Sequence, residues 1–132
     1  MKKVIFLVIG VGFFMFGSLV FSACAQNSPV AVVQNIDSKT FLNKMKEKNV
    51  IILDVRTPEE YAAGHIPNSV LIDYSAPDFK SKIEKLDKSK NYLVYCAAGG
   101  RSARASNVMV SGNFKSVYNL TGGFSQWNGP KE

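Results

Sequence analysis

Apolar residues follow two alternating patterns along most of this chain, short continuous runs and runs with helical spacing. The continuous runs predict strands over residues 32–36, 50–53, 70–72, 92–95 and 116–120. The helical patterns predict helices over residues 38–48, 58–63, 79–86 and 103–110, and a short last helix after residue 123. Strands that alternate with helices indicate an α/β fold, a parallel sheet of about five strands with helices on both faces.

Two local signals support this order of elements. The run Val50–Leu53 is rich in β-branched residues, as expected of a strand buried on both faces, and it stops at Asp54. Thr57, Pro58 and Glu60 form a capping-box pattern that starts a helix. Asp54 and Cys96 both follow predicted strands, and ligands of parallel sheets bind beyond these carboxyl ends. The fold prediction therefore points to that edge.

The N-terminus has the layout of an export signal. Lys2 and Lys3 precede a mostly apolar stretch over residues 4–20, and small residues follow at positions 22–25. We therefore predict a signal peptide or lipoprotein signal over residues 1–25, a tether over residues 26–31 and one domain over residues 32–130. The protein is expected to be exported, as a periplasmic protein or a membrane-anchored lipoprotein.

Cys24 leaves the processing of this signal open. Ala23-Cys24-Ala25 fits a cleavage site that leaves Gln26 as the new N-terminus. Residues 21–24 also resemble a lipobox, in which a lipid on Cys24 attaches the protein to a membrane, although Phe21 departs from the usual leucine. An uncleaved anchor is a third alternative, because the apolar stretch is nearly long enough to span a bilayer.

Length and charge limit the classes of function. The 132 residues suit one domain, which we expect to be a monomer. Without the signal, 14 basic and 10 acidic residues remain, a net charge of +4 that is spread over predicted helix surfaces. No aromatic residues interleave with a basic stripe, so a nucleic-acid partner is not expected. We also expect no cofactor and no metal.

The chain has two cysteines, and they differ in context. Cys24 lies in the processing region, a poor place for a structural disulfide, so we expect no bond between it and Cys96. Cys96 is then a free thiol in an exported protein. An unpaired thiol in an oxidising compartment favours a chemical role over a packing role.

The loop from Cys96 to Arg101 suits an activated thiolate. Ala97, Ala98, Gly99 and Gly100 have small or no side chains, so successive backbone N–H groups can point inward as an anion-binding nest. A helix follows, and its positive end together with Arg101 would favour thiolate over thiol. The loop alone leaves other interpretations open, namely a structural cysteine at a strand end or phosphate or arsenate chemistry.

Four motifs in order make this chain resemble the rhodanese-like family over residues 32–127. They span Leu53–Tyr61, Gly64–Ser69, Cys96–Ser102 and Val117–Phe124, with Trp127 close behind the last. The resemblance implies a parallel sheet of about five strands and a persulfide intermediate on Cys96. It also implies sulfur transfer rather than phosphatase or arsenate chemistry, because the related enzymes have a loop one residue longer.

Other polar residues have competing interpretations. Asp54 either contacts the substrate beside the Cys96 loop or caps a turn. Arg56 and Glu60 are four residues apart, which suggests an ion pair, and the resemblance implies that this pair is structural. His65, the single histidine, invites a role as general base, but the resemblance implies a structural turn residue. Tyr118, Phe124 and Trp127 are expected to pack in the core.

The resulting hypothesis is a sulfurtransferase with Cys96 as the catalytic residue. Its partners would be a small sulfur donor such as thiosulfate or a persulfide, and a thiol or cyanide acceptor. The backbone of residues 97–101 would hold the anionic sulfur. The alternative is a rhodanese-like module that acts as a low-turnover sulfur carrier or a non-catalytic interaction domain. A disulfide redox role is disfavoured because no resolving cysteine lies near Cys96.

Overall fold

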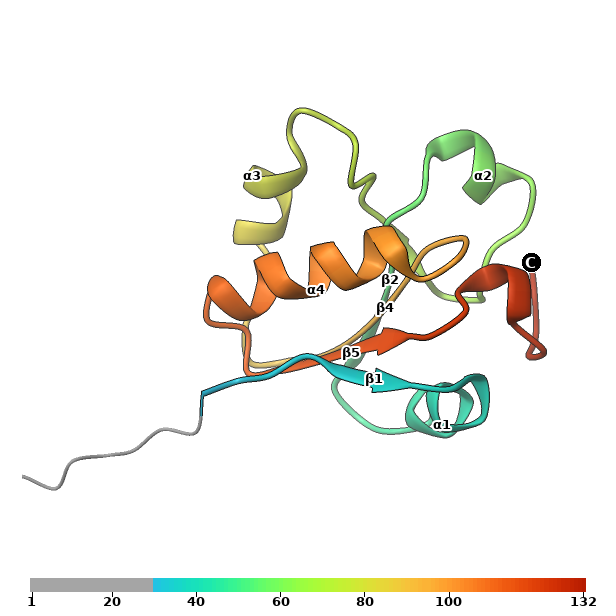
Figure 1. Ribbon diagram of the computed structural model, residues 1–132, viewed down its shortest axis with the longest axis horizontal. Coiled ribbons are helices and arrows are strands. Elements are labelled where there is room, and N and C mark those ends of the chain that lie inside the picture. The colour runs from blue at the N-terminus through green and yellow to red at the C-terminus, as the bar shows by residue number, and fades with distance from the viewer. Residues whose placement is uncertain (1–29) are drawn as a thin grey trace, which may run out of the picture.

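The computed structural model describes residues 30–132, which form a five-stranded sheet with helices on both faces (Figure 1). The strands are β1 (Gln34–Ile36), β2 (Val50–Asp54), β3 (Val70–Leu71), β4 (Asn91–Tyr95) and β5 (Ser116–Leu120). The helices are α1 (Ser38–Lys44), α2 (Pro58–Ala62), α3 (Phe79–Glu84), α4 (Gly100–Ser111) and the 3-10 helix η1 (Phe124–Gln126). The strand order is β1-β5-β4-β2-β3 and all pairs are parallel. The predicted fold class is thus confirmed.

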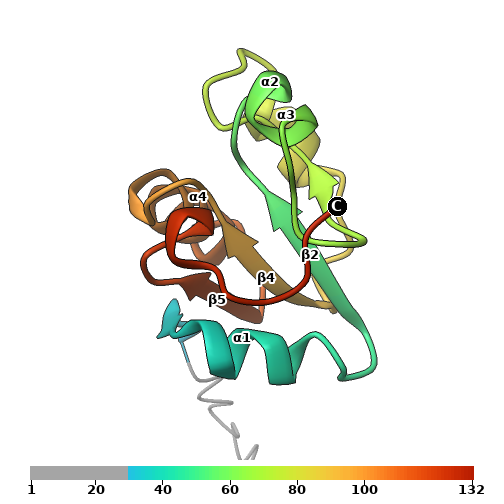
Figure 2. The ribbon, with the colours of Figure 1, turned by 90° about the vertical axis from the view of Figure 1, so that its right-hand side faces the viewer.

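The sheet separates two hydrophobic clusters, one on each of its faces. On one face, residues of α3 and α4 such as Ile83 and Met109 pack on Tyr92 and Val94 of β4. On the other face, Phe41 of α1 packs with Leu93 and Tyr95 of the same strand, together with Trp127. Figure 2 shows α1 on one side of the sheet and α3 and α4 on the other. Successive residues of β4 therefore enter opposite cores, which explains its continuous apolar run.

The first strand and the first helix are both shorter than predicted. Asp37 caps the helix by accepting a hydrogen bond from the Thr40 N–H at 2.8 Å. The helix ends at Lys44, not at the predicted Lys48, and the chain turns into β2 through Asn49, whose φ is +60°. Strand β1 starts at Gln34 rather than at Val32, which is 70% exposed, because pairing with β5 begins at Gln34.

The capping box of α2 is formed as predicted. The Thr57 hydroxyl accepts a hydrogen bond from the Glu60 N–H at 3.3 Å, and the Glu60 carboxylate accepts one from the Thr57 N–H at 3.0 Å. Pro58 occupies the first turn. This short helix starts just beyond the carboxyl end of β2, so the box fixes its position relative to the sheet edge.

The predicted signal and Cys24 lie outside the described residues, and their processing stays a prediction. Within residues 30–132, no helix has the length and apolarity needed to cross a membrane.

Candidate active site

Cys96 lies directly after β4, the central strand of the sheet. Residues 97–99 turn the chain into α4, which begins at Gly100. Gly99 has a φ of +99°, a backbone conformation that favours glycine and that reverses the chain around the thiol. Cys96 is a free cysteine with 1% of its surface exposed. The fold thus holds one thiol at the edge of the sheet where the sequence predicts a site.

Hydrogen-bond donors surround the Cys96 sulfur. The Gly99 N–H donates to Sγ at 3.0 Å and the Ser102 hydroxyl donates to it at 3.4 Å. Burial raises the pKa of the thiol, but hydrogen bonds from the Ser102 side chain and from backbone N–H groups of Ser102, Ala98 and Gly99 outweigh burial and lower the pKa. The loop and the first turn of α4 therefore stabilise the thiolate.

The turn at Gly123 and the start of η1 pack against the Cys96 loop and hold it through two hydrogen bonds. The Phe124 N–H donates to the Cys96 carbonyl at 2.7 Å and the Ser125 N–H to the Ala97 carbonyl at 3.0 Å. A Cβ on Gly123 would lie 2.6 Å from the Cys96 and Ala97 carbonyl oxygens, so this close approach requires glycine. Gly123 has φ +60° and ψ −161°, which glycine alone adopts readily.

Ser102 and Gly123 fall within two of the motifs that carry the resemblance, but neither is among the predicted site residues. The signal for Ser102 was its position in the first turn of the helix that follows the loop, where side chains can reach back to Sγ. The signal for Gly123 was its place in the fourth motif of the resemblance. The contacts of Ser102 and Gly123 with the Cys96 loop form only when the chain is folded.

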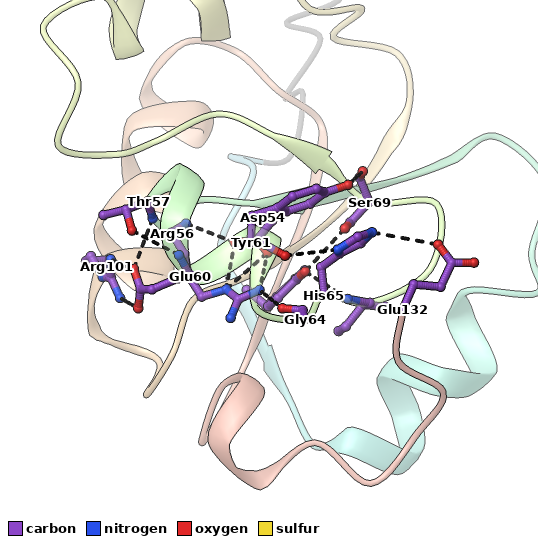
Figure 3. A network of polar contacts seen from close by, with 12 residues as sticks. Asp54, Arg56, Thr57, Glu60, Tyr61, Gly64, His65, Ser69, Arg101 and Glu132 are labelled. Carbon is purple, nitrogen blue, oxygen red and sulfur yellow. Dashed lines mark hydrogen bonds and ion pairs between the residues drawn. The ribbon is translucent and has the colours of Figure 1, made fainter.

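Arg101 binds a carboxylate beside the site. Its Nη1 and Nη2 donate to the two Glu60 oxygens, each at 2.8 Å, in a bidentate ion pair (Figure 3). The hydrogen bond from Arg101 outweighs desolvation and lowers the pKa of Glu60 to about 2, so both partners are charged at neutral pH. The predicted Arg56–Glu60 ion pair is wrong, because Glu60 faces α4 instead.

Arg56 pairs with Asp54 in the interior. The Arg56 guanidinium donates to the carboxylate at 2.7 to 3.1 Å and its backbone N–H donates at 2.9 Å. Arg56 also donates to the Gly64 carbonyl at 2.7 Å and lies 4.3 Å from the centre of the Phe124 ring. Asp54 has no exposed surface. This geometry favours the turn-capping role of Asp54 over contact with a substrate.

His65 lies in the turn that follows α2. Its ring stacks on Tyr61 at 3.8 Å between centroids, and Nδ1 lies 3.1 Å from the Tyr61 carbonyl. Its backbone N–H and carbonyl both bond Glu132, at 2.7 and 2.9 Å. These contacts are with the turn and with the C-terminal segment (Figure 3). They agree with the structural role that the resemblance implies.

Residues 30–132 contain no group of three histidine, cysteine, aspartate or glutamate side chains arranged to hold a metal ion.

Comparison with known proteins identifies the family. The profile of the Rhodanese-like domain matches residues 37–130. The chain belongs to the rhodanese-like family. Among its relatives, thiosulfate sulfurtransferase GlpE of Pseudomonas syringae is 36% identical over 84 residues, which cover 63% of this chain and 76% of the relative. Thiosulfate sulfurtransferase GlpE of Coxiella burnetii is 37% identical over 83 residues, with the same two coverages.

Solved structures of rhodanese-like proteins share the fold. A rhodanese-related protein from Thermoplasma volcanium superposes with a TM-score of 0.66 at 30% identity, covering 75% of this chain and 97% of that one. A rhodanese-like domain protein from Staphylococcus aureus gives 0.64 at 33% identity, covering 72% and 91%. At the level of the family, the two relatives named thiosulfate sulfurtransferase support a sulfurtransferase.

Proposed function

We propose that this rhodanese-like protein transfers sulfane sulfur from a donor such as thiosulfate or a persulfide to a thiol or cyanide, through a persulfide on Cys96. The observation that carries the proposal is the environment of Sγ. A free thiol at the end of the central strand accepts hydrogen bonds from Gly99 and Ser102, and these lower its pKa. A stabilised thiolate is the form of cysteine that attacks sulfur.

The first step forms a sulfur–sulfur bond on Cys96. The thiolate attacks the outer sulfur of the donor, and the existing bond to that sulfur breaks. The leaving group departs with the bonding electron pair, as sulfite from thiosulfate or as a thiolate from a persulfide. The negative charge then lies on the terminal sulfur of the Cys96 persulfide.

The second step returns the enzyme to its starting state. An acceptor thiolate or cyanide attacks the terminal sulfur, the bond to Sγ breaks, and Sγ leaves with the electron pair as a thiolate. No net proton or electron is gained by the protein. The donors that serve the resting thiolate, the Gly99 N–H and the Ser102 hydroxyl, stabilise the same leaving group. Such fixed donors need no rearrangement during the reaction.

Intact-mass measurement tests the proposal directly. Incubation with thiosulfate or an alkyl persulfide should add the mass of one sulfur atom at Cys96, and cyanide should remove it. Cys96→Ser should add none. The absence of added mass with several donors, while Cys96 stays reduced and open to alkylation, would rule out the transfer. Charging in one round without repeated turnover would instead support the carrier alternative.

A further inference from the structure

The ion pair between Arg101 and Glu60 controls the charge beside the Cys96 loop. Arg101 lies in the first turn of α4, and the negative charges of Glu60, Cys96 and Asp73 all raise its pKa. Arg101 also directly precedes Ser102, whose hydroxyl lies 3.4 Å from the Cys96 sulfur, so its charge lies beside the Cys96 loop. Its two terminal nitrogens, however, donate hydrogen bonds to both oxygens of Glu60.

The surrounding loop adds no charged side chain. Residues 97–100 are two alanines and two glycines. Arg56, two residues beyond the end of β2, is matched by the buried carboxylate of Asp54. An anion at Cys96 is thus held by backbone and hydroxyl dipoles, while the adjacent guanidinium charge is largely cancelled.

Resting on the proposed sulfur transfer, we propose that Glu60 sets the donor class through Arg101, so that donors with one negative charge, such as alkyl persulfides, are used in preference to dianions such as thiosulfate. Glu60 acts on Arg101 and not on the donor itself, so it is a positioning residue. The electrostatic reason is simple. A free cation attracts a dianion twice as strongly as a monoanion, and pairing with Glu60 removes most of that difference.

Glu60→Gln removes the negative charge at position 60 and should leave the fold of α2 intact. Glutamine also completes a capping box, so it can accept the hydrogen bond from the Thr57 N–H and keep α2 in place. The amide has no charge to cancel Arg101. Glu59 provides a matched control, because it lies in the same first turn of α2 and is exposed, and the Arg101 guanidinium bonds Glu60 rather than Glu59.

The experiment compares how fast two donors charge Cys96. Rate constants for persulfide formation are measured by rapid quench and intact mass, with thiosulfate as the dianion and 2-hydroxyethyl persulfide as the monoanion. The wild-type protein should be charged faster by the persulfide. Glu60→Gln should raise the thiosulfate-to-persulfide ratio about threefold at low salt. The gain should shrink as ionic strength rises, because the pair is partly exposed.

Two further variants distinguish an effect of the charge at position 60 from an effect of altered structure. Glu59→Gln should leave the ratio near the wild-type value, whereas Arg101→Gln should lower it, because Glu60 is then left without a partner. An unchanged ratio in Glu60→Gln, an equal shift in Glu59→Gln, or faster charging of the wild type by thiosulfate would overturn the donor preference. Failure of both donors to charge wild-type Cys96 would overturn the sulfur transfer itself.

Discussion

At the scale of single residues, Ser102 is the side chain that most favours the Cys96 thiolate. Burial of a thiol in apolar surroundings alone raises its pKa, yet the pKa of Cys96 is lowered. The Ser102 hydroxyl is the largest of the influences that lower it, ahead of the backbone N–H groups. Ser102 itself is fully buried, and its hydroxyl lies 3.4 Å from the Cys96 sulfur and 3.2 Å from the Gly99 carbonyl oxygen.

Ser102→Ala should therefore raise the pKa of Cys96. Loss of one hydrogen bond to the charged form should slow alkylation by iodoacetamide at neutral pH about fivefold. The rate should approach that of the wild type at high pH, where the thiol is ionised in both proteins. The pH profile of alkylation measures this shift.

Ser106 supplies the control for that measurement. It lies one turn further along α4, is fully buried, and its hydroxyl has no hydrogen-bond partner in the described structure. Ser106→Ala should leave the pH profile of Cys96 in place. An equal shift in both variants would show that the effect comes from altered packing of α4, not from the hydrogen bond.

At the scale of elements, the site depends on two turns that fit against each other. The loop after β4 carries Cys96, and the first two residues of η1 donate their N–H groups to its carbonyls. Gly123 permits this approach, since a side chain there would collide with the carbonyls of Cys96 and Ala97. Gly100 differs, because an added Cβ would meet no atom within 4 Å.

Gly123→Ala should destabilise the protein and displace the loop. The collision and the positive φ should together lower the free energy of unfolding by about 2–3 kcal/mol. Urea denaturation measures this change. Gly100→Ala is the matched substitution, and it should change the same quantity by less than about 1 kcal/mol. Similar losses in both variants would contradict a specific contact at Gly123.

At the scale of the whole molecule, the Asp54–Arg56 pair ties the central sheet to the segments around it. Asp54 ends β2, and the Arg56 guanidinium reaches from it to the Gly64 carbonyl and the Phe124 ring. The side chains of Asp54 and Arg56 are 0% and 4% exposed. Charges buried to this degree depend on each other, because neither is solvated by water.

Arg56→Met should therefore be strongly destabilising. Methionine fills much of the same space but leaves the Asp54 carboxylate buried without a countercharge, a loss of about 3–5 kcal/mol in unfolding free energy. Thermal and urea denaturation measure the loss. Arg104→Met, at an exposed position on α4, should cost less than about 0.5 kcal/mol. Equal effects would mean that the buried pair adds nothing specific.

Features that depend on neighbouring residues can be predicted from the sequence. The apolar run of β4, the capping box of α2 and the glycine-rich turn after Cys96 each need contacts within a few positions, so their pattern predicts them. The order of strands and helices, and with it the α/β class, follows from the same periodicity. Element ends also depend on the turns that follow them, and α1 stops at Lys44 rather than at the predicted Lys48.

Contacts between distant residues, in contrast, are visible only in the folded protein. Glu60 is four residues from Arg56, yet it pairs with Arg101, which is 41 residues away. Gly123 lies against the Cys96 loop although it is 27 positions further along the chain. Such partners depend on which strand ends and turns lie side by side in the folded sheet. The physical reason is that packing of the whole core fixes those positions, whereas spacing along the chain fixes only local geometry.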